Sequence, residues 1–196
     1  MLKDLPNKLC VLRILLSPVF FVLFTSSWKY GKLISLFLVI IIEATDLIDG
    51  IIARRTNQVT DFGKILDPFA DKIAKLTYFL GFLYYQYFPI WMFLIIVYRE
   101  FFLTIFRQYA ERKNIIIAAR LTGKLKSEVQ AIGSIIIILL ININLLIKPI
   151  EKINVYIYLI MLLITLITLL SIIDYIVAYF FLLKKINNNK ENYDKS

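Results

Sequence analysis

The sequence predicts an all-α integral membrane protein with six transmembrane helices and a polar cavity that faces the cytoplasm. Two observations carry this prediction. First, 60% of the 196 residues are hydrophobic and the mean hydropathy is +0.75, far above that of a soluble domain. Second, apolar runs such as 34–42, 132–143 and 155–173 approach or reach the roughly 20 residues that cross a bilayer.

The six helices are expected to follow the apolar runs in chain order. The first run is interpreted as a retained helix rather than a cleaved signal peptide, because Asp4 and Arg13 interrupt it and no small-residue cleavage site follows. Pro68 disfavours helical geometry at Asp67, so the third helix is expected to begin irregularly there. The expected helices span residues 9–26, 33–54, 65–86, 88–111, 127–146 and 154–183.

One membrane domain is expected over residues 1–183, and segment 184–196 is expected to be a basic, disordered tail because it is rich in Asn and Lys. Basic residues predict the orientation of the helices. With the amino terminus inside, fifteen Lys and Arg residues fall in the inner segments and four in the outer turns. Since cytoplasmic loops carry the excess of Lys and Arg, both termini are expected in the cytoplasm, in a multi-pass protein of the cell (inner) membrane.

The composition excludes several kinds of chemistry. The chain has no histidine, so Ser-His and Cys-His mechanisms and the usual transition-metal ligands are absent. Its single cysteine, Cys10, excludes an internal disulfide and a cysteine-rich zinc site. The net charge of +9 is typical of cytoplasmic loops that lie against anionic membrane lipids, and no nucleic-acid partner is expected. Carboxylates, lysines and arginines must therefore carry any catalysis.

Four aspartates lie near the cytoplasmic ends of the second and third expected helices, where a carboxylate close to lipid is costly. At about 100° per residue, Asp46 and Asp49 lie within about 60° of each other, and Asp67 and Asp71 within about 40°. The helices are adjacent and antiparallel, so the two pairs can converge. Two divalent ions about 3.5–4 Å apart would neutralise them, and oxygen ligands favour Mg²⁺ or Mn²⁺. In the alternative interpretation the aspartates are helix caps or ion-pair partners of Arg54, Lys64, Lys72 and Lys75.

The segment from Asp46 to Asp71 resembles the signature of the CDP-alcohol phosphatidyltransferase family, D-x-x-D-G-x-x-A-R, eight residues, then G-x-x-x-D-x-x-x-D. Every fixed position matches, namely Asp46, Asp49, Gly50, Ala53, Arg54, Gly63, Asp67 and Asp71. The resemblance implies that a CDP-linked lipid donates its phosphatidyl group to an alcohol and releases CMP. It also implies that the four aspartates bind the two metal ions, that Asp71 is the general base, and that the enzyme is a homodimer. The residues implied in CDP binding are Asp49, Gly50, Ala53, Arg54, Gly63 and Lys72.

Cationic side chains in the fourth helix and in the segment after it suit a second anion, most simply an acceptor phosphate. They are Arg99, Arg107, Arg120, Lys124 and Lys126. The motifs R-E-x-F at 99–102 and G-K-x-K-S-x-x-Q at 123–130 resemble the branch of the family that makes phosphatidylglycerophosphate, which usually has Thr where this chain has Ser127. The resemblance implies CDP-diacylglycerol as the donor and glycerol 3-phosphate as the acceptor.

Other interpretations stay open at this point. The acceptor could instead be inositol phosphate, serine or phosphatidylglycerol, and the chain could be a membrane transporter in which buried charges form an ion path. Arg99 could pair with Glu100 or with an acid on another helix. Glu43 could support the metal ligands or be a hydrogen-bonded buried acid, and Asp174 could pair with an arginine of another helix.

Overall fold

The computed structural model describes residues 5–28, 30–56, 61–112 and 121–193. Within these ranges the chain forms six α-helices and no strand, which confirms the number and order of helices expected from the apolar runs. The helices are α1 (Leu5–Thr25), α2 (Gly31–Thr56), α3 (Asp61–Tyr84), α4 (Ile90–Arg112), α5 (Leu121–Leu146) and α6 (Ile153–Tyr193).

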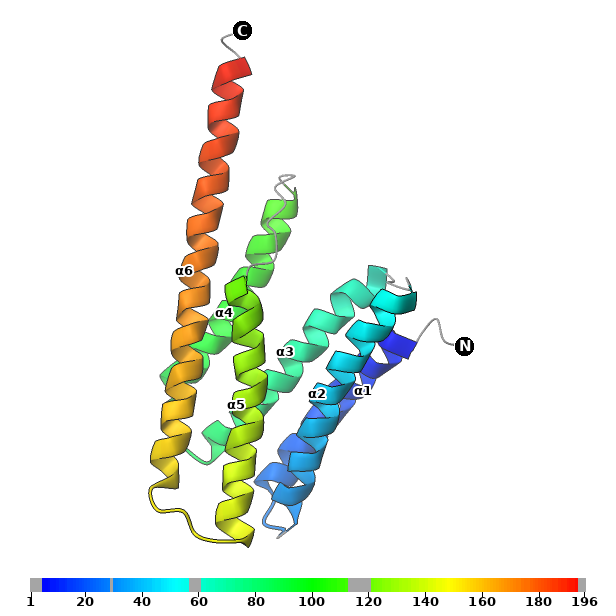
Figure 1. Ribbon diagram of the computed structural model, residues 1–196, viewed down its shortest axis with the longest axis vertical. Coiled ribbons are helices and arrows are strands. Elements are labelled where there is room, and N and C mark those ends of the chain that lie inside the picture. Colours follow the sequence, from blue (N-terminus) through cyan, green and yellow to red (C-terminus); the bar gives the residue numbers. More distant parts are fainter. Residues whose placement is uncertain (1–4, 29, 57–60, 113–120, 194–196) are drawn as a thin grey trace.

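The helices form two groups of three (Figure 1). α1 packs against both α2 and α3, and α6 packs against both α4 and α5. α5 also contacts α2 and α3, and α4 contacts α3, so the two groups are joined along α5 and at the α3–α4 contact. This arrangement brings Asp71 of α3 within contact of Ser127 near the start of α5, although 56 positions separate them in the sequence.

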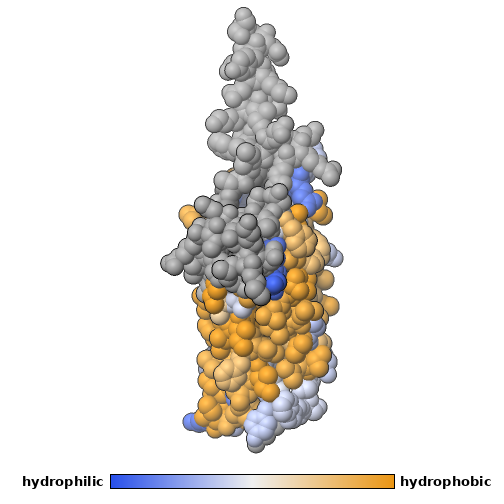
Figure 2. Space-filling view, turned by 90° about the vertical axis from the view of Figure 1, so that its right-hand side faces the viewer, coloured by the Kyte–Doolittle hydropathy of each residue, from blue (hydrophilic) through white to orange (hydrophobic). Residues whose placement is uncertain are grey.

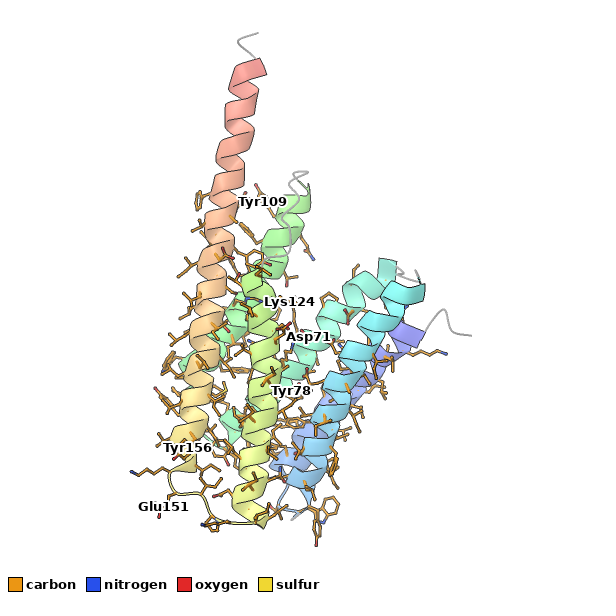
Figure 3. All side chains as sticks on the ribbon, in the orientation of Figure 1. Asp71, Tyr78, Tyr109, Lys124, Glu151 and Tyr156 are labelled. Atoms are coloured by element: carbon orange, nitrogen blue, oxygen red, sulfur yellow. The ribbon has the colours of Figure 1, made fainter. Side chains whose placement is uncertain are left out.

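The core between α1 and α3 is built largely from aromatic rings. The rings of Phe20 and Tyr78 meet edge to face with their centroids 5.0 Å apart, and both side chains are buried. Gly81 lets Phe24 approach α3, since a Cβ atom at Gly81 would lie 3.0 Å from Cδ1 of Phe24. In Figure 3, Asp71 lies nearer than Tyr78 to the end of the bundle at which α6 ends. Their spacing in the sequence corresponds to about two helical turns of α3. The aromatic core therefore holds the helix that carries Asp71.

Three segments of the described chain are long and apolar enough to cross a membrane: Asn7–Thr25, Leu121–Leu146 and Ile153–Phe180. Large apolar side chains are exposed on the outside of the bundle, and apolar residues cover most of the described surface in Figure 2. A continuous exposed apolar surface of this kind matches lipid and not water. We conclude that this is a membrane protein.

α5 begins earlier than expected. It starts at Leu121 rather than at residue 127, so the basic residues of the G-K-x-K-S motif lie in its first turns and not in a loop. Contacts with α6 explain the difference. Thr122 donates a hydrogen bond to Asp174 at 2.5 Å, and a Cβ atom at Gly123 would lie 3.0 Å from the hydroxyl oxygen of Tyr175. Tertiary packing thus extends the helix through a segment whose glycine and charges favour a loop.

α3 and α6 each differ from the expectation at one end. α3 begins at Asp61 and continues through Pro68, so the irregular start expected at Asp67 is wrong. A proline inside a helix removes a backbone hydrogen bond, and the packing of α3 against α1, α4 and α5 outweighs that loss. α6 continues to Tyr193, since no proline or glycine interrupts it after residue 183. The division into a membrane domain and a tail at that residue stays a prediction.

Candidate active site

Two of the four motif aspartates meet at one arginine of α1. The Nη1 atom of Arg13 lies 2.5 Å from Oδ1 of Asp46 on α2 and 3.5 Å from Oδ1 of Asp67 on α3. The thiol of Cys10, one turn earlier on α1, lies 3.8 Å from the same oxygen of Asp67. Since both carboxylates contact a single nitrogen, acids from adjacent helices converge at this point.

Arg13 is a site residue that sequence reasoning did not identify. Its side chain is only 1% exposed although it carries a full charge. A buried guanidinium is stable only where carboxylates and hydrogen-bond acceptors surround it, so its two aspartate contacts explain its burial. The one signal in the sequence is an arginine that interrupts an apolar helix. The partners lie 33 and 54 positions away, and no local pattern indicates them.

Asp71 has a different set of partners. Its Oδ1 atom lies 2.6 Å from Nζ of Lys75, one turn later on α3. The hydroxyl of Ser127 on α5 donates to Oδ2 of Asp71 at 3.4 Å, and Lys75 donates to that hydroxyl at 2.5 Å. These three side chains form a closed polar group that joins α3 to α5. The ion pair with Lys75 is one of those considered in the alternative interpretation of the aspartates.

A second polar group lies among α4, α5 and α6. The Nη1 atom of Arg99 donates to both carboxylate oxygens of Glu100, at 3.0 and 3.2 Å, and Lys126 of α5 donates to the same carboxylate. The Nε atom of Arg99 donates to the hydroxyl of Ser171 on α6 at 3.0 Å. All four side chains are buried. In this Arg99–Glu100–Lys126 cluster one carboxylate faces two cations, so the cluster carries an excess of positive charge.

A cavity of about 370 Å³ adjoins the cluster between α3 and α4. Arg99 and Glu100 form part of its wall, together with Lys72 of α3, whose ammonium donates to the hydroxyl of Thr104 at 2.5 Å. Apolar side chains such as Phe69 complete the lining. The volume falls in the range of small-molecule pockets, about 300–1,000 Å³. The cavity therefore combines room for a small ligand with cationic donors.

The remaining expected site residues either do not belong to these two polar groups or lie outside the described part of the chain. Lys124 is exposed, lies 3.9 Å from Glu128 on the same helix, and is found at a level of the bundle similar to that of Asp71 (Figure 3). Gly63 lies in the first turn of α3. Outside the described part of the chain lie the side chains of Asp49, Ala53, Arg54 and Arg107, the surroundings of Gly50, and the whole of Arg120.

The donor set around Arg13 fits a hard divalent cation. Asp46 and Asp67 offer only carboxylate oxygens, and both approach one cationic nitrogen, so the space between them accommodates positive charge. Within the described ranges, no group of three or more His, Cys, Asp or Glu side chains surrounds a single point in the manner of a metal site. The side chain of Asp49, expected to complete the set, lies outside those ranges.

Comparison with known proteins agrees with the motif. A family model described as CDP-alcohol phosphatidyltransferase matches residues 3–183. A CDP-diacylglycerol–glycerol-3-phosphate 3-phosphatidyltransferase from Bacillus subtilis (strain 168) is 34% identical over 142 residues, which cover 66% of this chain and 74% of that protein. A protein of the same name from Treponema pallidum (strain Nichols) is 33% identical over 62% of this chain and 57% of its own length. Another, from Rickettsia typhi (strain ATCC VR-144 / Wilmington), is 32% identical over 70% of this chain and 78% of its own length.

Proposed function

Because this chain belongs to the CDP-alcohol phosphatidyltransferase family, we propose that it transfers the phosphatidyl group of CDP-diacylglycerol to glycerol 3-phosphate, giving phosphatidylglycerophosphate and CMP. One structural observation supports this pairing of substrates most directly. Ser127 contacts Asp71, and the next residue back, Lys126, belongs to the cationic cluster. Consecutive residues of α5 therefore contact the proposed general base, Asp71 of α3, and the proposed binding site for an acceptor anion.

In the proposed reaction, Asp46, Asp49, Asp67 and Asp71 hold two Mg²⁺ or Mn²⁺ ions. When bound, these ions withdraw charge from the pyrophosphate and stabilise the departing CMP. Asp71 accepts the proton of the acceptor hydroxyl, whose oxygen attacks the phosphorus that carries the diacylglycerol, and the bond from that phosphorus to CMP breaks. Lys75 and Ser127 orient the Asp71 carboxylate, since both contact it.

The acceptor phosphate is proposed to bind the cationic side chains around Glu100, because these outnumber the carboxylates there. Arg99 and Lys126 share the single carboxylate of Glu100, and Lys72 adds a third cation to the wall of the adjoining cavity. A dianionic phosphate accepts hydrogen bonds from these cations worth about 1.5–3 kcal/mol each, with opposite charge on both partners, whereas a neutral polyol offers only uncharged oxygens. Arg107, Arg120 and Lys124 are proposed to add positive charge at the same end of the helices.

The nucleotide of the donor is proposed to lie along the motif face of α2 and α3. The motif supports this position: Gly50 and Ala53 would give the nucleotide room, Arg54 would bind near its phosphates, and Asp49, Gly63 and Lys72 would complete its site. Lys72 lines the cavity that also contains Arg99, which supports a position between the two substrates.

We further propose that all six helices cross the inner membrane, that both termini and the site face the cytoplasm, and that the enzyme is a homodimer. Six long helices and the distribution of Lys and Arg support the topology. A cytoplasmic site gives the water-soluble acceptor and CMP direct access to it. The dimer rests on family resemblance.

The test is CMP release by the purified protein from CDP-diacylglycerol with Mg²⁺ or Mn²⁺. We expect release that depends on glycerol 3-phosphate and is not supported by serine, inositol or inositol phosphate. Asp71→Asn, which keeps the side-chain volume, is the control and should lose about 10²–10⁴ in rate. Preference for another acceptor would overturn the choice of substrate, and no CMP release with any acceptor would favour a transporter.

A further inference from the structure

α6 contributes three buried hydroxyl residues to an otherwise apolar stretch, and one of them behaves differently from the others. Thr165 and Thr168 donate hydrogen bonds to the carbonyl groups of Met161 and Ile164, one turn back on their own helix. This is the usual way in which hydroxyls are satisfied inside apolar helices. Thr168 also accepts a hydrogen bond from the neutral amide of Gln130 on α5, at 3.4 Å. Ser171 instead accepts a hydrogen bond from a charged group of another helix, the Nε atom of Arg99, at 3.0 Å.

The guanidinium of Arg99 is held from two sides. Ser171 of α6 takes its Nε–H, and Glu100 of α4 takes Nη1 through both carboxylate oxygens. Two contacts at different edges define the orientation of a planar group. The Nη2 atom has no acceptor among the described residues, and Arg99 lines the 370 Å³ cavity. The Nη2 donors of the guanidinium are therefore available to an anion that binds in this cavity.

We propose that Ser171 is a positioning residue for the acceptor substrate: by holding Nε of Arg99 it orients the remaining donors of the guanidinium toward the phosphate of the acceptor. This inference rests on the proposed function, because it assumes that Arg99 binds that phosphate. It assigns to α6, which carries none of the family motif, a part in acceptor recognition.

Loss of the Ser171 hydroxyl has a defined consequence. In Ser171→Ala, Nε of Arg99 loses its acceptor, and the guanidinium turns about its last torsions toward Glu100. The phosphate then loses roughly one oriented charge-assisted hydrogen bond, which corresponds to about a 10-fold weaker interaction. We expect the KM for glycerol 3-phosphate to rise about 10-fold, with kcat and the KM for CDP-diacylglycerol changed less than twofold.

The matched control is Thr165→Val. Thr165 is 1% exposed and its hydroxyl bonds only within α6, so the variant removes a buried hydroxyl from the same helix without touching Arg99. It should leave both KM values unchanged. Ser171→Cys, which keeps the volume but is a weak acceptor, is measured alongside and is expected to be intermediate. It decides the question if Ser171→Ala is not recovered folded.

A double-mutant cycle with Arg99→Lys separates positioning from a general structural role. Lysine has no Nε–H at that position, so Ser171→Ala should have no further effect on the KM for glycerol 3-phosphate in the Arg99→Lys background. A second readout does not need catalysis: glycerol 3-phosphate should raise the melting temperature of the wild-type protein more than that of Ser171→Ala.

Three results would overturn the inference: an unchanged KM for glycerol 3-phosphate in Ser171→Ala, an equal effect in Thr165→Val, or additive effects in the cycle. These outcomes differ from failure of the proposed function. If the wild-type enzyme uses another phosphorylated acceptor, the choice of glycerol 3-phosphate is wrong, and Ser171→Ala should raise the KM for that acceptor instead. If glycerol 3-phosphate is the acceptor and Ser171→Ala has no effect, only the role of Ser171 is wrong.

Discussion

Replacing Arg13 by glutamine is expected to destabilise the protein mainly when divalent cations are absent. Arg13 is 1% exposed, whereas its partners Asp46 and Asp67 are 34% and 50% exposed. Removing one partner of a fully buried ion pair costs about 3–5 kcal/mol, and an exposed pair is worth about 0–1 kcal/mol. Because the carboxylates are partly solvated, we expect a loss between these limits, about 2 kcal/mol. For a chain of this size that corresponds to about 4–8 °C in melting temperature.

The assay is thermal unfolding in detergent, followed by circular dichroism, in excess chelator and again in saturating Mg²⁺ or Mn²⁺. If Asp46 and Asp67 bind metal, the metal neutralises them in the variant, so the deficit of Arg13→Gln should be smaller with metal than with chelator. Lys8→Gln is the control, because Lys8 is exposed on the same helix. A variant as stable as wild type in chelator would refute the electrostatic role of Arg13. Equal deficits in both conditions would contradict metal binding by Asp46 and Asp67.

Three further predictions concern the metal site, the topology and the packing. Asp67→Asn should keep the fold but lose several orders of magnitude in CMP release, as should the wild type in chelator; normal turnover in either case would refute the metal site. With Cys10 replaced by Ser, Lys152→Cys should react with a membrane-impermeant thiol reagent in intact cells and Ser196→Cys only after permeabilisation; the reverse pattern would invert the topology. Gly31→Ala should destabilise by about 1–3 kcal/mol in a thermal melt, because its Cβ would lie 2.5 Å from the carbonyl oxygen of Leu23. Gly133→Ala, where the nearest atom is the flexible end of Ile164, should cost less, and equal losses would contradict this argument.

Features that repeat within one helix could be predicted from the sequence. The apolar runs indicate the six helices, and the spacing of Asp46, Asp49, Asp67 and Asp71 places acids at one end of two neighbouring helices. These predictions depend on the periodicity of a single helix, which the sequence shows directly. The contact of Asp46 and Asp67 with one nitrogen is consistent with them.

Contacts between distant helices could not be predicted in the same way. Nothing near Arg13 indicates that its partners are on α2 and α3, and nothing near Arg99 indicates Ser171, 72 positions later. The early start of α5 has the same cause, since the contact of Thr122 with α6 stabilises a turn that local propensity does not favour. Each of these features depends on which helices become neighbours, and a single sequence does not specify that.

The two groups of ion-paired residues at the candidate site have opposite net charge. The group around Asp71 has three carboxylates in contact with two cations, and the group around Glu100 has one carboxylate in contact with two. A pyrophosphate cannot bind carboxylates unless divalent cations lie between them, whereas a phosphate can bind the cations of the protein directly. In the proposed reaction the two substrates should therefore differ in their need for metal. We expect glycerol 3-phosphate to raise the melting temperature in excess chelator, and CDP-diacylglycerol to do so only with Mg²⁺ or Mn²⁺. Stabilisation by the donor in chelator, or none by the acceptor without metal, would show that the two groups do not bind the substrates separately.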